Sequence, residues 1–379
     1  MEYKKLGDIA TYINGYAFKP EQRGSEGLPI IRIQDLTGNA YDLGYYNGDY
    51  PKKVELNDGD VLISWSASLG VYLWNRGKAL LNQHIFKVVF DKVEIDKFYF
   101  MYAVEYNLDK MSLKTHGATM KHITKKDFDN VVIPYPDLDY QKEVAYRLTS
   151  LKGIIENYKK QLDLLDELVK ARFVEMFGDP VTNDMLWNTD VLKDICTKIG
   201  SGSTPRGGKE SYIDEGISLI RSMNVHNAYF EYKDLAHITL DQAEKLNNVV
   251  VEHDDLLFNI TGASVARCCV VPSDVLPARV NQHVCILRCR GKINPIFLQG
   301  LLVNENYQGK LLQIAKSGAT REAINKQQLE SLEIMIPPLE LQNQFASFVQ
   351  EIDKSRSRIQ KSLEASQELF DSLMQEYFG

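Results

Sequence analysis

The sequence predicts an α+β protein in which two mixed α/β domains, related by an approximate two-fold axis, are joined by two long antiparallel coiled-coil helices. The first observation behind this prediction is a duplication. Residues 117–178 align with residues 318–379 at a constant offset of 201, without a gap. Gly117-Ala118-Thr119, for example, matches Gly318-Ala319-Thr320. A repeat unit of roughly 190 residues is far longer than the repeats of solenoids, so it indicates a duplicated domain.

The upstream part of each copy also matches once small gaps are allowed. Arg32 aligns with Arg221 and Asp60 with Asp255, which gives offsets of 189 and 195. The changing offset means that the loops between these positions differ in length. What both copies share should be scaffold, or a contact made twice, and what differs should act differently in each half.

The alternation of apolar and polar residues places the elements in order. Short β-branched runs predict strands at 28–33, 61–63, 85–90 and 131–133, with counterparts at 217–220, 256–260, 284–289 and 332–336. Shorter helices are expected at 96–107 and 295–315, and the sheet should be mixed or antiparallel. The predicted domains are 1–138 and 179–338, and the predicted helical regions are 139–178 and 339–379.

Two long helices should begin at Gln141 and Gln342, directly after proline-rich breaks. Each would contain about 37 residues and be ~55 Å long at 1.5 Å per residue. Their apolar positions follow heptads that we predict to form the coiled-coil interface: Leu151, Ile155, Tyr158, Leu162, Leu165 and Val169 in the first, and Ile352, Ile359, Leu363, Phe370 and Leu373 in the second. The alternative is that each helix packs on its own domain.

Composition limits the class of protein. Charged residues make up 25% and hydrophobic residues 44%, as in ordinary soluble domains. No apolar run approaches the ~18 residues of a membrane span and no signal-peptide core follows Met1, so we expect a cytoplasmic protein with no membrane partner. The net charge of −7 argues against a uniformly basic nucleic-acid binder. Any contact with DNA must therefore come from local basic patches.

The five cysteines all lie in the second half, and their odd number fits no disulfide framework. Cys268, Cys285, Cys289 and His283 could in principle hold zinc. In the first copy, however, Phe86 and Phe90 stand where the second has Cys285 and Cys289. We therefore expect small core-facing side chains and no metal site.

Signatures of catalysis are missing from the sequence. It contains no Walker loop, no zincin histidine pair, no Gly-x-Ser-x-Gly elbow and no dinucleotide-binding glycine motif. His84 and His283 recur in equivalent strands, but no Ser, Cys or carboxylate shared by both copies forms an obvious triad with them. We expect both histidines to be structural hydrogen-bonding residues and predict no catalytic residue.

Loops rich in Gly, Ser, Thr and basic residues are better candidates for a functional surface. The segment 201–209 combines small residues, hydroxyls and two cations, which suits close approach to a phosphodiester backbone or a base edge. Similar segments lie at 64–70, 114–121, 259–267 and 316–321, although a plain solvated loop has the same composition. The predicted DNA contacts are Lys19, Arg32, Ser64, Ser66, Lys114, His116, Thr119, Lys121, Ser203, Thr204, Arg206, Lys209, Arg221, Asn259, Thr261, Arg267, Lys316, Thr320 and Arg321.

The order of these motifs resembles that of a known family, the specificity subunits of type I restriction-modification systems. The resemblance covers nearly the whole chain. It is carried by Ser201-Gly202-Ser203-Thr204-Pro205, by Ser317-Gly318-Ala319-Thr320, by the helix entry at 337–342 and by the Phe-Gly ending of both helices. The first copy departs from the pattern at 135–141 and at His116.

The resemblance implies that each α/β domain is a target recognition domain reading one half of a bipartite DNA site, while the coiled coil fixes the spacer. It further implies two methylation subunits and restriction subunits with motor and nuclease activity as partners. S-adenosylmethionine, ATP and Mg²⁺ would belong to those partners, and this chain would hold no cofactor. The target adenine would be flipped out of the duplex for methylation.

The sequence is also compatible with three alternatives. The chain could serve another bipartite restriction system, paired to a combined methylase-nuclease. It could be a methyltransferase or nuclease by itself, which binding of S-adenosylmethionine by the isolated chain would favour. It could be a coiled-coil scaffold without DNA binding.

Overall fold

The computed structural model describes residues 2–38, 42–114, 124–289, 291–316 and 322–379. The chain divides into two compact units, one formed by residues 1–159 and 361–379 and the other by residues 160–360. Each unit contains one α/β domain and part of both long helices, α5 (Leu138–Phe177) and α11 (Leu339–Phe378).

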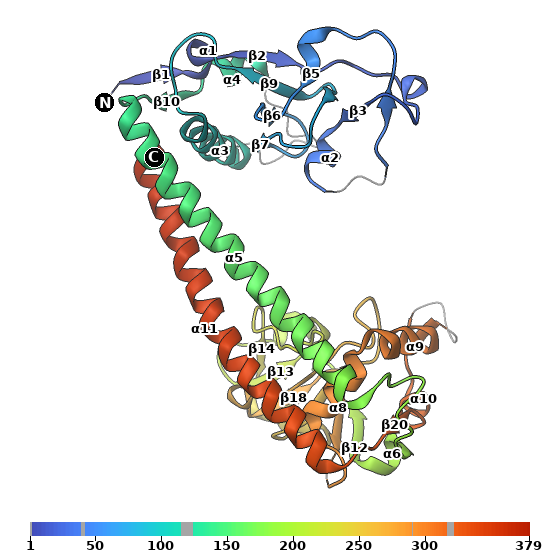
Figure 1. Cartoon of the computed structure of the whole chain (residues 1–379). Coiled ribbons are helices and arrows are strands. Elements are labelled where there is room, and N and C mark those ends of the chain that lie inside the picture. The colour runs from blue at the N-terminus through green and yellow to red at the C-terminus, as the bar shows by residue number, and fades with distance from the viewer. Residues whose placement is uncertain (1, 39–41, 115–123, 290, 317–321) are drawn as a thin grey trace. The chain divides into compact units, whose positions relative to one another are not determined.

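The α/β domain of the first unit has two four-stranded sheets and a two-stranded sheet (Figure 1). The strand orders are β2-β9-β6-β7, which is antiparallel throughout, β4-β3-β8-β5, in which β3 and β8 are parallel, and β1-β10. Its elements are β1 (Tyr3–Lys5), α1 (Leu6–Ile9), β2 (Thr11–Asn14), β3 (Leu28–Ile31), α2 (Ile33–Leu36), β4 (Tyr45–Tyr46), β5 (Glu55–Leu56), β6 (Val61–Ser64), β7 (Gly70–Leu73), β8 (Ala79–Leu81), β9 (Ile85–Val89), α3 (Lys97–Lys114), α4 (Lys125–Asp129) and β10 (Val132–Pro134).

The second unit repeats this topology strand for strand. Its sheets have the orders β12-β19-β16-β17, β14-β13-β18-β15 and β11-β20, and β13 and β18 are again parallel. Its elements are β11 (Thr189–Val191), α6 (Leu192–Ile195), β12 (Cys196–Ser201), β13 (Ile217–Ile220), β14 (Ala236–Ile238), α7 (Leu240–Glu244), β15 (Val250–Val251), β16 (Leu256–Asn259), β17 (Cys268–Val270), β18 (Ala278–Val280), β19 (Val284–Cys289), α8 (Pro295–Val303), α9 (Glu305–Lys316), α10 (Lys326–Glu330) and β20 (Glu333–Met335). The duplication read from the sequence is therefore a duplication of fold.

In both units one central strand separates two cores. Every residue of β16 is buried, and successive side chains of a strand point to opposite faces. Leu256 and Phe258 accordingly belong to the core beneath the helices, whereas Leu257 belongs to the core shared with the sheet containing β13. In the first unit β6 does the same, because Val61 and Leu62 lie in different cores.

The shared glutamines at the long helices are buried and hold each helix to its domain. Gln141 accepts a hydrogen bond from the backbone N–H of Asp96 at 2.9 Å and donates to the carbonyl of Pro136 at 2.8 Å. Gln342 repeats these two bonds with Asn294 and Pro337, at the same two distances. Buried amide groups require such partners, so both positions need glutamine.

The long helices are antiparallel in the second unit, where contacts follow opposite directions along the two helices (Figure 1). Arg356 of α11 pairs with Asp166 of α5 at 2.5 Å. Further along α5, Phe173 packs against Phe345, which lies earlier in α11, with ring centroids 5.5 Å apart. The alternative in which each helix packs only on its own domain is therefore wrong.

The end of each long helix completes the α/β core that belongs to the other copy. Phe177, at the end of α5, packs on Phe297 of the second unit with ring centroids 4.8 Å apart. Phe378, at the end of α11, packs on Tyr99 of the first unit at 5.2 Å. All four side chains are buried. This explains why the Phe-Gly ending occurs in both copies.

The predicted coiled-coil residues differ in how far they are buried. Leu151 and Ile155 are buried. The others are partly buried, namely Tyr158, Leu162, Leu165, Val169, Ile352, Ile359, Leu363, Phe370 and Leu373. Among them Phe370 and Leu373 pack against the core of the first unit and Val169 against that of the second.

Several predicted bounds need correction. The long helices begin at Leu138 and Leu339, three residues before the shared glutamines. The helix expected at 295–315 is two helices, because Asn304 has an extended backbone with φ −58° and ψ 137°. The side-chain oxygen of Asn304 accepts the N–H of Asn306 at 3.0 Å and so caps the second helix.

The expectation of no disulfide is also contradicted. Cys196 and Cys289 are direct partners in the pairing of β12 with β19, and a disulfide joins them. An odd number of cysteines says nothing about which two positions a sheet register brings together. Cys268, Cys269 and Cys285 are free and buried, as expected for small core residues. Burial raises the pKa of the Cys285 thiol to about 12.

Candidate nucleic-acid interface

A polar hollow of about 450 Å³ lies in the second unit, where the loops that follow β13, β16 and β18 meet. Small, hydroxyl-bearing and basic side chains line it. They are Ser222, Met223, His226, Thr261, Gly262, Ala263, Ser264, Arg267 and His283. This hollow unites two predicted DNA contacts, Thr261 and Arg267.

Arg267 is held in this hollow by a histidine that follows β13. One terminal nitrogen of its guanidinium, Nη1, lies 3.4 Å from Nδ1 of His226. Nε2 of the same ring lies 3.2 Å from the carbonyl oxygen of Met223, which can only accept. Nε2 therefore carries the proton, and in the neutral ring Nδ1 accepts from Arg267. The ring also stacks on Tyr229, with centroids 4.6 Å apart and planes at 15°.

A chain of hydrogen bonds joins two of the predicted loops through the segment that follows β18. Thr204 donates to the side-chain oxygen of Gln282. The amide nitrogen of Gln282 lies 3.1 Å from Nε2 of His283, so that Nε2 accepts. Nδ1 of His283 then donates to the hydroxyl oxygen of Thr261 at 2.6 Å. The hydroxyl proton of Thr261 is left free to donate to a ligand. His283 is thus a structural hydrogen-bonding residue, as expected.

Ser64 and Asn259 do not reach the surface, which corrects their assignment as DNA contacts. Both side chains are completely buried. Asn259 donates from its amide to the carbonyls of Ser222 at 2.9 Å and Val225 at 3.3 Å, which fixes the loop before His226. Ser64 donates to the carbonyl of Ser68 at 2.5 Å. These residues shape loops, and Ser66 is nearly as buried, with 8% of its surface exposed.

The two shared arginines are already bonded within the chain. Arg32 pairs with Asp35 at 2.9 Å, and this hydrogen bond raises the pKa of the guanidinium. Arg221 donates to the backbone carbonyl of Asp234 and lies over the Tyr212 ring, 5.4 Å from its centroid. Both hold the loop that follows a parallel strand, which favours the scaffold role over a phosphate contact.

The remaining predicted contacts divide into exposed residues and residues without a described side chain. Lys19, Ser203, Arg206, Lys209 and Lys316 are exposed, and Thr204 is partly exposed. The side chain of Lys114 and all of His116, Thr119, Lys121, Thr320 and Arg321 lie outside the described residues. Glu322, just after this gap, accepts a hydrogen bond from Gly262 of the hollow at 3.0 Å. The chain therefore approaches the hollow directly after residue 321.

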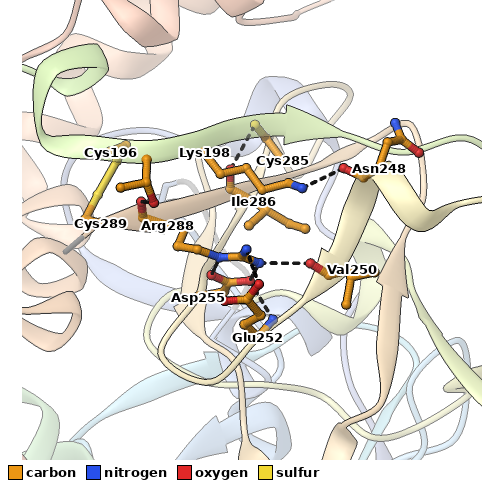
Figure 2. Close-up of polar contacts among 11 residues, drawn as sticks. Cys196, Lys198, Asn248, Val250, Glu252, Asp255, Cys285, Ile286, Arg288 and Cys289 are labelled. Carbon is orange, nitrogen blue, oxygen red and sulfur yellow. Dashed lines mark hydrogen bonds and ion pairs between the residues drawn. A yellow bond between two sulfur atoms is a disulfide. The ribbon is translucent and has the colours of Figure 1, made fainter.

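A buried ion pair joins the residue before β16 to β19, and sequence reasoning noted only its aspartate. Asp255 is completely buried and receives two hydrogen bonds of 2.7 Å from Arg288 (Figure 2). Arg288 also donates to the carbonyl of Val250 at 2.9 Å and pairs with Glu252. The bonds to Asp255 raise the pKa of the Arg288 guanidinium. In the first unit Asp60, the counterpart of Asp255, pairs at 2.8 Å with Lys87, which aligns with Ile286 and so lies two residues before the counterpart of Arg288.

The counterpart of the hollow in the first unit has different chemistry. The strand registers place Gly70 opposite Ser64, as Arg267 lies opposite Asn259, so a glycine stands in the position of Arg267. Counting from the shared arginines, Thr37 stands in the position of His226. Trp65, which follows Ser64, contacts the ring of His84 with centroids 5.0 Å apart and stacks on Phe86 of the adjoining core at 5.6 Å.

Sequence reasoning missed His226 and Met223, because nothing in the spacing connects the loop after β13 with Arg267. Only the difference between the copies could have drawn attention to His226. The described residues contain no group of three or more His, Cys, Asp or Glu side chains that could hold a metal ion. Within the same residues, no helix is long and apolar enough to cross a membrane.

Comparison with known proteins is consistent with this geometry. Residues 1–166 and 185–367 match the family model described as the type I restriction modification DNA specificity domain. The two matched segments correspond to the two copies. The chain belongs to this family.

Named relatives extend the match over nearly the full length. The chain is 24% identical to the specificity subunit of the type I restriction enzyme EcoBI from Escherichia coli, over 94% of this chain and 80% of that protein. It is 22% identical to the MjaVIII specificity subunit from Methanocaldococcus jannaschii, over 95% of this chain and 89% of that protein.

Solved structures share the fold. The crystal structure of the type I restriction-modification S subunit from M. genitalium matches with a TM-score of 0.64 and 14% identity, over 100% of this chain and 96% of that chain. A chain solved in work on complex assembly and conformational transition of the type I system matches with a TM-score of 0.54 and 15% identity, over 99% and 97%.

Proposed function

We propose that this chain is the non-catalytic DNA-reading subunit of a type I restriction-modification complex. Each α/β domain reads one half of a bipartite target, and α5 and α11 together fix the length of the unspecified spacer. The observation that carries the proposal is a fold repeated strand for strand whose candidate loops differ between the copies. Two DNA-binding domains with the same scaffold and different contact residues suit a target whose two half-sites differ in sequence.

The residues of the hollow favour a role in DNA recognition for this chain, with catalysis carried out by partner subunits. The hollow offers hydrogen-bond donors and the cation of Arg267, which suit phosphates and base edges, and Nδ1 of His283 donates to the Thr261 hydroxyl instead of accepting its proton. Methylation chemistry therefore falls to two methylation subunits, which bring S-adenosylmethionine. Cleavage falls to restriction subunits, which use ATP and Mg²⁺. This chain contributes the target sequence and a surface for assembly, and it works in the cytoplasm, where the DNA lies.

Methylome sequencing tests the proposal. Cells carrying the complete system should methylate adenines in one bipartite motif, and deletion of this gene should remove that methylation entirely. Restoring the gene is the control. If deletion leaves the methylome unchanged, the proposed function is wrong. If the isolated chain methylates DNA without its partners, the non-catalytic assignment is wrong.

A further inference from the structure

We infer that Arg267 is a specificity-determining residue that reads a guanine in the half-site of the second domain, and that His226 positions it. The inference rests on the proposed function, since it concerns the same DNA-reading surface. It names one contact and its chemistry: the guanidinium fork of Arg267 donates to N7 and O6 of the guanine edge.

The first support is that the guanidinium of Arg267 is available. It is only partly buried and lines the hollow. No carboxylate among the described residues lies within ion-pair distance of it. Among the other arginine side chains of this domain, Arg288 is bonded to Asp255 and Arg279 to the carbonyl of Ala243 at 3.1 Å, whereas the exposed Arg206 does not line the hollow. Arginine has five N–H donors, and His226 takes one of them.

The second support is that the fork has a fixed orientation. The bond from His226 to the Met223 carbonyl and the stack on Tyr229 hold the imidazole ring. Asn259 anchors the preceding backbone from below. Contacts thus lead from the buried amide of Asn259 through His226 to the guanidinium of Arg267. A side chain that recognises a base needs such support, because its orientation must be fixed. A phosphate contact requires only a cation and would be satisfied by a mobile lysine.

The third support is that Arg267 and His226 occur in the second copy only. Gly70 and Thr37 stand where the second unit has Arg267 and His226. The shared glutamines, by contrast, make the same two hydrogen bonds in both copies. Residues that read different half-sites must differ between copies, whereas residues that hold the scaffold need not.

Binding by the assembled complex with its methylation subunits tests the inference. The motif of the unaltered complex is first read from the methylome. Each base pair of its second half-site is then substituted, and the dissociation constants are compared for unaltered protein, Arg267→Ala and Arg267→Lys. We expect both variants to lose roughly 10- to 100-fold of the discrimination at one G·C pair and to keep the discrimination elsewhere.

Other outcomes overturn the inference. A uniform loss over all sequences, with a weaker dependence on salt, would identify a phosphate contact. Unchanged discrimination, or a second half-site without a G·C pair, would exclude the guanine contact. These results leave the proposed function intact, which fails only if no bipartite motif depends on the chain. Lys245→Ala, an exposed cation after α7 that does not line the hollow, is the matched control.

His226 is tested as a positioning residue through rescue. His226→Leu removes the acceptor for Arg267, so discrimination at the same G·C pair should fall as in Arg267→Ala. His226→Asn places an amide oxygen near the position of Nδ1, so it should restore most of that discrimination. Equal loss in both variants, with unchanged thermal unfolding, would contradict the positioning role.

Discussion

At the scale of single residues, the structure separates side chains that build the loops from side chains that are available to a ligand. The ion pair of Asp255 and Arg288 is the clearest case of the first kind, because Asp255 is completely buried and both of its oxygens accept hydrogen bonds from Arg288. A buried charge that loses its partner is strongly destabilising, since water cannot replace the lost interaction.

Asp255→Asn should therefore lower the free energy of unfolding by about 3–5 kcal/mol. Arg288 would keep Glu252 as a partner but would lose the carboxylate that is completely buried. Urea denaturation followed by circular dichroism measures the change. Asp254→Asn is the control, because Asp254 is exposed and its left-handed backbone, with φ 66°, suits asparagine. Equal unfolding midpoints for the two variants would contradict the structural role of the pair.

The same distinction explains which predicted contacts could be found from sequence. Composition identified the loop at 259–267 correctly as a place where polar groups gather, and Arg267 lines the hollow. It could not tell that Asn259 points inward, because polar residues at the end of a strand look alike whether they hold a loop or face solvent. The partnership of Arg267 with His226 depends on folding across 41 positions, which no local pattern records.

At the scale of elements, the long helices are both a partner for each other and a part of the domain cores. Their amphipathic pattern and their proline-marked entries made them predictable. The break between α8 and α9 was not, because the sequence remains apolar through Val303 and the cap is formed by the side chain of one residue, Asn304. The disulfide of Cys196 with Cys289 likewise depends on the register of two strands.

Phe177→Ala should destabilise the second unit by about 3–5 kcal/mol, the usual cost of removing a fully buried aromatic side chain. The ring contacts Phe173, Phe297 and Phe345, so its loss leaves a cavity where α5, α8 and α11 meet. Thermal unfolding of the whole chain measures the effect. Val174→Ala, three residues earlier and 47% exposed, should change stability by much less. A smaller effect for Phe177 than for Val174 would contradict the anchoring role.

At the scale of the whole molecule, the duplication divides the sequence into constant and variable parts. Strand order, buried glutamines and the aromatic helix ends are equal in the two copies, whereas the loops around the hollow differ. Comparing the copies predicted this division from the sequence. It did not predict the side-chain geometry of the hollow, which arises from three loops distant in sequence.

Exchange of residues 187–338 for the second domain of a related subunit should change one half of the methylated motif and leave the other half unaltered. The helices keep Phe173, Phe177 and Phe345, so the donor domain needs a matching aromatic residue at the position of Phe297. Methylome sequencing reads the outcome, and exchange of the first domain is the reciprocal control. A change in both halves of the motif would contradict independent reading by the two domains.

The insertion of each helix end into the other copy's domain also sets the order in which the protein can mature on the ribosome. The first unit buries Met374, Tyr377 and Phe378 in its core, and Tyr106 donates a hydrogen bond to Gln375, 269 residues further along the chain. The domain that is synthesised first therefore cannot close its core until residues 374–378 have emerged. We therefore expect this domain to complete its core late in translation, with the apolar side chains that contact residues 374–378 exposed until then.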